Sequence, residues 1–190
     1  MIPVEADLLA TLGRLVEVLE ATSTSYALIG GIAKAAWGRA RATRDIDIAI
    51  SVDASGLTTL QSTLAAYGFE TTTMVGSTDA DGRPDIFVAK GPFGVPVDVL
   101  VAKTPFEEDA VARSVPIELL GQRVHVVTAE DLVFYKLLAG RPRDRDDVLD
   151  VIRAQIAGGR PFDWARLTRL SGEWEIEDTL AAVRKEAGVD

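Results

Sequence analysis

The sequence predicts a protein of the α/β (α+β) class with a helical C-terminal cap, and two observations predict it. Up to about residue 128, short apolar strand patterns are interspersed with amphipathic helix patterns, and this mixture is typical of a sheet packed against helices. From residue 129 onward the patterns are helical. We therefore expect an α/β core over residues 1–128 and a helical segment over residues 129–190 that packs on the core.

The first part of the chain contains patterns for three helices and two strands. Leucines recur at helical spacing after residue 5, and Gly68 is a stop signal for the third helix. Around residue 47, acidic and apolar residues alternate, which indicates a strand with one face lining a site. The expected helices are 5–22, 31–38 and 55–67, and the expected strands are 26–30 and 45–51.

The second part begins with strand patterns and ends with helical ones. Asp79-Ala80-Asp81-Gly82 supplies turn chemistry between two strands, and Thr128 with Asp131 resembles a capping box that opens a helix. The expected strands are 69–75, 85–89, 95–101, 117–120 and 124–127. The expected helices are 106–113, 129–139, 144–157, 162–170 and 173–187.

Composition excludes several classes of function. The chain has 190 residues, no cysteine and one histidine, His125, so disulfides, thiolate metal sites and a multi-histidine zinc site are excluded. No apolar run is long enough for a membrane span, and the first residues lack a signal-peptide pattern, so we expect a cytoplasmic protein. The net charge of −9 disfavours broad DNA binding but leaves a small or structured RNA substrate open.

Asp45 and Asp47 are the first candidate site residues. They are separated by one residue on an expected strand, so their side chains project to the same face. Two neighbouring carboxylates do not both stay ionised easily without a cation. Upstream, Gly30 and Gly31 follow an apolar strand, where the absence of a Cβ lets the backbone turn tightly and approach a ligand. This combination indicates acidic metal ligands beside a backbone cradle for phosphate.

Asp98 is the third candidate carboxylate. It is the lone charged residue of the apolar strand 95–101, where burial without a partner is costly. Its neighbours at 97 and 99 point to the other face, so Asp98 can share a cleft with Asp45 and Asp47. Magnesium suits such a set, because it prefers a few carboxylate oxygens together with water and substrate phosphates.

These residues resemble a known family. Gly30-Gly31, Arg41, Thr43, Asp45-Ile46-Asp47, Asp98 and the segment from Lys136 to Asp147 are similar to the minimal nucleotidyltransferases of the DNA polymerase β type, most closely to the AbiEii-like toxin branch and its uncharacterised bacterial relatives. The resemblance spans roughly residues 25–150. It implies the nucleotidyltransferase fold, a mixed twisted sheet flanked by helices, and transfer of a nucleoside monophosphate from a nucleoside triphosphate to an acceptor hydroxyl with release of pyrophosphate.

The resemblance also implies roles for these residues. Asp45 and Asp47 would bind two Mg²⁺ ions, which Mn²⁺ could replace, and Asp98 would bind the catalytic ion and help to activate the acceptor. Gly30 and Gly31 would hold the β- and γ-phosphates through backbone N–H groups. Lys136 would reach the triphosphate across the cleft.

Several of these positions have a second interpretation. Lys136 can instead be a lysine whose stem covers apolar surface. Arg41 either neutralises phosphate or pairs with the acidic cluster, and Thr43 either contacts nucleotide or orders the loop before the strand. Asp147 and Asp144 lie on one helix face and either hold Lys136 or Arg141 in place or form an acidic first turn.

The sequence leaves the acceptor and some functional alternatives open. The acceptor can be an RNA end, a protein or a small molecule, and a toxin-like member would have an antitoxin protein as a partner. A non-catalytic member that keeps the fold to bind nucleotide or a partner is the alternative. A metal-dependent phosphohydrolase is disfavoured, because a single histidine leaves few ligands for such sites.

Overall fold

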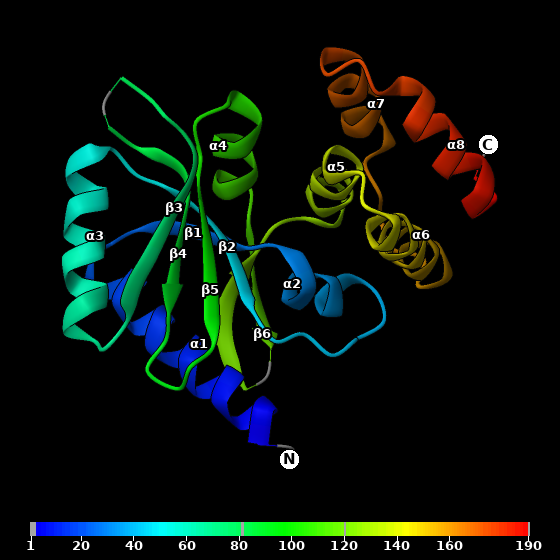
Figure 1. Cartoon of the computed structure of the whole chain (residues 1–190). Coiled ribbons are helices and arrows are strands. Elements are labelled where there is room, and N and C mark those ends of the chain that lie inside the picture. Colours follow the sequence, from blue (N-terminus) through cyan, green and yellow to red (C-terminus); the bar gives the residue numbers. More distant parts are fainter. Residues whose placement is uncertain (1–2, 81, 120, 190) are drawn as a thin grey trace.

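The computed structural model describes residues 3–80, 82–119 and 121–189 (Figure 1). These residues form a mixed sheet with helices on both faces and a group of helices at the C-terminal end, which confirms the expected α/β class. The strands are β1 (Ser25–Leu28), β2 (Ile46–Ser51), β3 (Glu70–Thr78), β4 (Pro84–Lys90), β5 (Pro96–Val101), β6 (Val115–Leu119) and β7 (Gln122–Val126). The helices are α1 (Pro3–Ala21), α2 (Gly30–Trp37), α3 (Ala54–Ala66), α4 (Pro105–Ala112), α5 (Ala129–Ala139), α6 (Pro142–Ala157), α7 (Trp164–Glu173) and α8 (Glu177–Ala187).

The seven-stranded sheet has the order β3-β4-β5-β2-β1-β7-β6. The pairs β2–β5 and β1–β7 are parallel, and the other neighbours are antiparallel. Strand β2 therefore lies at the centre, between β5 and β1. Because β1 and β2 are antiparallel, the end of β1 lies beside the beginning of β2.

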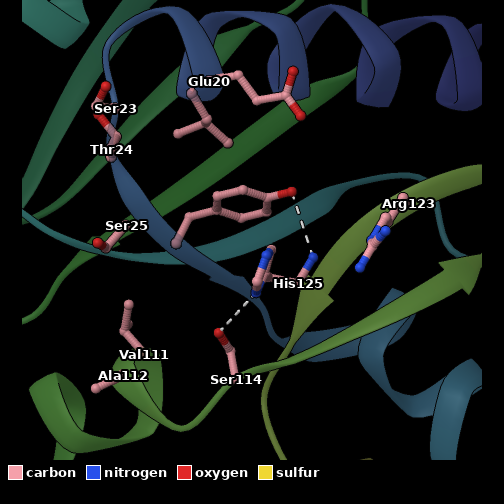
Figure 2. Close-up of a pocket in the computed structure, with 11 residues that line it drawn as sticks. Glu20, Ser23, Thr24, Ser25, Val111, Ala112, Ser114, Arg123 and His125 are labelled. Atoms are coloured by element: carbon pink, nitrogen blue, oxygen red, sulfur yellow. Dashed lines mark hydrogen bonds between the residues drawn. The ribbon is translucent and has the colours of Figure 1, made fainter.

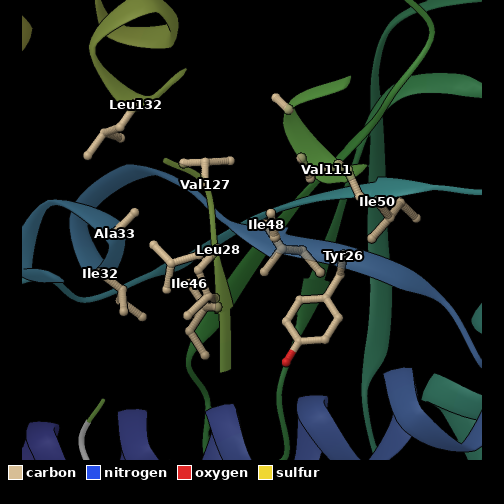
Figure 3. Packing of buried hydrophobic residues seen from close by; sticks show 14 of the residues in the cluster. Tyr26, Leu28, Ile32, Ala33, Ile46, Ile48, Ile50, Val111, Val127 and Leu132 are labelled. Atoms are coloured by element: carbon tan, nitrogen blue, oxygen red, sulfur yellow. The ribbon is translucent and has the colours of Figure 1, made fainter. Parts of the chain in front are cut away.

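Alternation of side chains along β2 separates the core from the site. Ile46, Ile48 and Ile50 are at most 1% exposed and pack in the hydrophobic core, as Figure 3 shows. Helices α1 and α3 contact each other, and α2 and α4 contact β2. Asp47 has the opposite orientation to these isoleucines, because neighbouring residues of a strand point to opposite faces.

Several expected boundaries differ from the observed ones. Strand β1 ends at Leu28, and helix α2 already begins at Gly30, whose φ is +62°. Helix α6 begins at Pro142, because proline fits the first turn of a helix, where its missing N–H is not needed. The expected helix 173–187 is wrong in its first turn, because α7 ends at Glu173 and Glu175 has a φ of +55°. Asp81 and Leu120, which fell in an expected turn and strand, lie outside the described residues.

The C-terminal helices are tied to the core by charged and polar contacts. Helices α2 and α6 contact each other, and Gln155 of α6, which is 2% exposed, donates a hydrogen bond of 2.6 Å to the carbonyl of Trp37 at the end of α2. The expected division into an α/β core and a helical segment at residue 128 stays a prediction. Helices from the two sides of this position are in direct contact. Within the described residues, no helix is long and apolar enough to span a membrane.

A buried ion pair holds α7 on α5. Asp131 is wholly buried, and its Oδ1 accepts a hydrogen bond of 2.7 Å from Nε of Arg166, whose Nη1 also lies 2.6 Å from Oδ2 of Asp109. Arg166 therefore links three helices, α4, α5 and α7.

We expect Arg166→Met to destabilise the protein by about 3–5 kcal/mol, because it leaves the buried carboxylate of Asp131 without its main counter-charge. Arg169→Met is the matched control on the same helix: Arg169 pairs with Glu173 at the surface, and such a pair contributes less than about 1 kcal/mol. Urea unfolding measures both. Equal losses in the two variants would contradict this account of α7.

Candidate functional site

Two of the three candidate carboxylates lie side by side. Asp47 of β2 and Asp98 of β5 are register partners in the parallel pair, so their side chains project from the same face of the sheet. Asp45 lies two residues before Asp47, at the entrance to β2. All three side chains are half-buried. The structure thus brings together the acidic residues that the sequence separates by more than fifty positions.

Gly30 and Gly31 form the turn that faces these carboxylates. The Ile29 N–H donates a hydrogen bond of 2.9 Å to the Asp47 carbonyl, and the Gly31 N–H points to Oδ2 of Asp47 at 3.4 Å. A Cβ at Gly30 would overlap the Asp47 carboxylate, and the positive φ of Gly30 also favours glycine. Asp47 and the start of α2 are therefore in direct contact.

Thr43 orients Asp45. Its hydroxyl donates a hydrogen bond of 2.6 Å to Oδ1 of Asp45. A Cβ on Gly31 would lie 2.6 Å from the same hydroxyl oxygen, so the absence of a side chain at Gly31 makes room for Thr43. Thr43 therefore connects the loop before β2 to the Asp45 carboxylate.

The pKa values of Asp47 and Asp98 are both raised. Burial, then the negative charge of Asp45 and, to a smaller extent, that of Asp98, raise the pKa of Asp47 to about 6. Burial and the charge of Asp45 likewise raise the pKa of Asp98. The Gly31 N–H and the ammonium of Lys136 act in the opposite direction on Asp47. Ionisation of these carboxylates therefore costs free energy in the folded protein, and a bound cation would reduce that cost.

Lys136 of α5 is 7% exposed, and its charge acts on Asp47. Its Nζ donates hydrogen bonds to Oδ1 of Asp144 at 2.9 Å and to Oδ2 of Asp147 at 2.7 Å. Arg41 also donates to Asp147, through Nε at 3.3 Å and Nη2 at 3.2 Å. Burial alone would raise the pKa of Asp147, but these hydrogen bonds outweigh it and lower that pKa. Asp147 therefore lies among cations, as their counter-ion.

Sequence reasoning missed two charged residues of this region, Lys34 and Asp150. Lys34 of α2 is 5% exposed, and its Nζ lies 2.6 Å from Oδ2 of Asp150 and 3.9 Å from Oδ1 of Asp147. The available signal was the spacing of Asp144, Asp147 and Asp150, which places three carboxylates on one face of α6.

The donor set suits a hard divalent cation, although the side chains do not enclose one as they are placed. Across residues 3–80, 82–119 and 121–189, no three carboxylate or imidazole groups converge closely enough to ligate one ion. The carboxylates of Asp45, Asp47 and Asp98 are the oxygen donors that Mg²⁺ prefers, and burial, followed by the charge of Asp45, raises the pKa of Asp47, so a cation here would stabilise its ionised form. The residues present therefore fit a magnesium ion in their chemistry.

A separate cavity of about 580 Å³ lies near the opposite end of β1 (Figure 2). Tyr26, Ser114 and His125 line it; the Tyr26 hydroxyl accepts a hydrogen bond of 3.4 Å from the His125 backbone N–H, and the Ser114 hydroxyl lies 3.3 Å from Nδ1 of His125. None of the candidate carboxylates lines this cavity. It is therefore distinct from the acidic face.

Comparison with known proteins identifies the fold. Neither a scan against protein-family models nor a search of curated proteins gives a match. Among solved structures, ANT(2″)-Ia in complex with adenylyl-2″-tobramycin is similar over 94% of this chain and 98% of that chain, with a TM-score of 0.55 and 14% identity. A nucleotidyltransferase-like protein from Paracoccidioides brasiliensis matches over 92% and 91%, with a TM-score of 0.52 and 22% identity.

A third structure is similar over a smaller part of the chain. The lincomycin-bound lincosamide antibiotic adenylyltransferase LnuA matches over 75% of this chain and 94% of that chain, with a TM-score of 0.52 and 15% identity. At these identities the likeness establishes the fold, and the expected nucleotidyltransferase fold is confirmed. The closer resemblance to the AbiEii-like branch stays a prediction.

The raised pKa of Asp47 predicts that this carboxylate destabilises the metal-free protein. The folded state binds the Asp47 proton more tightly than the unfolded state, so stability is lost as the pH rises from the ordinary aspartate pKa through about 6. Asp47→Asn should therefore raise the free energy of unfolding in EDTA, by up to about 3 kcal/mol at pH 8 and by roughly half of that near pH 5.

Asp53→Asn is the control for this measurement. Asp53 caps α3, and the Gly56 N–H, followed by the Ser55 hydroxyl, lowers its pKa, so its removal should give no gain in stability. A loss of stability in Asp47→Asn at pH 8 would refute the assignment of Asp47 as a strained carboxylate.

Proposed function

We propose that the protein is a magnesium-dependent nucleotidyltransferase, which moves a nucleoside monophosphate from a nucleoside triphosphate to an acceptor hydroxyl and releases pyrophosphate. The observation that carries this proposal is the pairing of Asp47 with Asp98 next to the Gly30–Gly31 turn. The fold supports it, because the solved structures of the same fold include ANT(2″)-Ia in complex with adenylyl-2″-tobramycin and a lincomycin-bound lincosamide antibiotic adenylyltransferase.

The acidic face has two tasks in this reaction. Asp45, Asp47 and Asp98 would hold magnesium, which would neutralise charge on the α-phosphate and on the leaving pyrophosphate. Asp98 would also accept the proton of the attacking hydroxyl, since its pKa is raised by burial and by Asp45, and a raised pKa makes a carboxylate a better base. Thr43 holds Asp45 in one orientation for this purpose.

The start of α2 would hold the triphosphate. Ile29, the N-cap residue, makes no side-chain cap hydrogen bond, so the first turn of the helix offers an anion its positive dipole end and its N–H groups other than that of Gly31, which donates to Asp47. Lys136 would supply a positive charge on the other side, with Asp144 and Asp147 keeping its ammonium group in position. Arg41 would add a second positive charge, held by Asp147.

The acceptor class defines the biological role. An RNA end, a protein and a small molecule all offer a hydroxyl, and a toxin acting on one of the first two would be neutralised by an antitoxin protein. Incubation with α-labelled triphosphates and three acceptor pools, namely total RNA, a protein extract, and aminoglycosides with lincosamides, distinguishes these classes by where the label goes. Growth arrest on expression, relieved by a neighbouring gene, would identify a toxin.

The same assay tests the proposed reaction. We expect label transfer with Mg²⁺ or Mn²⁺, and a decrease on the order of 100-fold or more in Asp47→Asn and Asp98→Asn, because each change removes a negative ligand from the metal site. Asp53→Asn should keep full activity, since asparagine is an equally good helix cap. A complete lack of transfer in all pools, with every nucleotide and either metal, would refute the proposal.

The proposed reaction also has an expected pH dependence. Asp47 has to lose its proton to bind metal, and its pKa is raised to about 6, so activity should fall as the pH decreases through about 6. Higher magnesium concentrations should move this limb to lower pH, because metal and proton compete for the same carboxylate. A limb that stays in place when the Mg²⁺ concentration is raised by about tenfold or more would contradict the role of Asp47 as a ligand.

A further inference from the structure

The segment between α2 and β2, residues 38–45, carries three candidate residues into the site: Arg41, Thr43 and Asp45. We call it the site loop. It has no regular secondary structure, so its conformation depends on contacts with the rest of the protein. The Asp45 carboxylate therefore has a well-defined position only when this loop has a well-defined conformation.

Two charged side chains hold the backbone of Arg39 at the start of the loop. Nζ of Lys34 donates a hydrogen bond of 2.6 Å to the Arg39 carbonyl, and the Arg39 N–H donates one of 2.8 Å to Oδ2 of Asp150. Lys34 and Asp150 also pair with each other at 2.6 Å. The three contacts form a closed ring, in which both the N–H and the carbonyl of Arg39 are bound.

The ring joins a buried side chain, that of Lys34, to an exposed residue, Arg39, at a cavity of about 540 Å³ that Gly38, Arg39 and Asp150 help to line. The side chain of Lys34 is 6% exposed and that of Asp150 is 21% exposed. A Cβ on Gly38 would lie 2.9 Å from Oδ2 of Asp150, so the helix α6 approaches the loop at the closest distance that a glycine allows. Hydrogen bonds to charged groups are stronger than neutral ones, especially away from water.

Helix α6 holds the loop at a second point. Asp147, one turn before Asp150, accepts the hydrogen bonds of Arg41. The contacts at Arg39 and Arg41 together fix the direction of the chain before Thr43, which then orients Asp45 through its hydroxyl. A continuous series of contacts therefore runs from α6 through the site loop to Asp45.

We propose that Lys34 and Asp150 are positioning residues, which hold the site loop against α6 and so keep Asp45 and Arg41 in place for the reaction. The effect on turnover rests on the proposed function, whereas the effect on the loop does not. Neither side chain is proposed to touch nucleotide or metal.

Limited proteolysis with trypsin tests the effect on the loop directly, because the loop contains Arg39, Arg41 and Arg44. We expect Lys34→Met and Asp150→Asn to increase the rate of cleavage after these arginines by roughly tenfold, since each change removes a charged hydrogen bond that closes the loop. Mass spectrometry identifies the cut sites. Asp150 is partly exposed, so Asp150→Asn should fold even if Lys34→Met does not.

Lys103→Met is the matched control. Lys103 pairs with Asp85 at 2.8 Å, beyond the far end of β5 from Asp98, and its loss should leave cleavage in the loop unchanged. Faster loop cleavage in both test variants, with unchanged cleavage after Arg123, supports the proposal. Equal loop cleavage in all variants, or an increase spread equally over all arginines, would overturn it.

The transfer assay adds a readout that a merely structural role would not move. Lys34→Met should lower kcat by roughly tenfold and also raise the KM for nucleotide, because Asp45 and Arg41 both lie on the loop, and Lys34→Arg, which keeps the charge, should recover most of the loss. An unchanged kcat despite a loosened loop would overturn the catalytic part of the proposal. If the wild-type protein transfers nothing, the proposed function fails, and the proteolysis alone decides whether Lys34 and Asp150 position the loop.

Discussion

The parallel pairing of β2 with β5 is the constraint on which the candidate site depends. It places Asp47 and Asp98 at the same register and on the same face, although they are far apart in the sequence. The antiparallel pairing of β1 with β2 then places the Gly30 turn beside Asp47, because one strand ends where the other begins. A shift of β5 by one residue would turn Asp98 to the opposite face. The buried valines of β5 prevent this shift, because they would then leave the core.

The charges around the site are arranged in layers. The charge of Lys136 acts on Asp47 of β2, and Lys136 and Arg41 both bind Asp147, so that the carboxylates of α6 form a second acidic layer. The second layer explains how Lys136 can be buried and charged without a ligand. In the proposed reaction, a triphosphate would meet an ammonium group that is already positioned and dehydrated, so little ordering would remain to be done on binding.

Much of the acidic face could be predicted from local patterns. The two-residue period of strands places Asp45 and Asp47 on one face, and a lone aspartate in an apolar strand indicates a partner for Asp98. The order of the strands could not be predicted in this way, because it depends on contacts between distant segments. Lys34 shows the same limit: in the helix around it only its charge is unusual, and its partner Asp150 is more than one hundred residues away. At the break near Glu175, the nearest glycine, Gly172, lies within α7, and the residue with the positive φ is a glutamate.

The helices after residue 128 are part of the candidate site as much as they are a cover for the core. Helix α6 supplies Asp147 and Asp150 to the site loop and Gln155 to the last turn of α2. If α6 left the core, Lys34 and Lys136 would lose their counter-ions, the end of α2 would lose a buried hydrogen bond, and the site loop would lose both of its anchors. These losses occur together, because the same helix makes all the contacts. Helix α6 and the site loop should therefore open together, as one cooperative unit. The stability of the C-terminal helices then determines how precisely Asp45 is held.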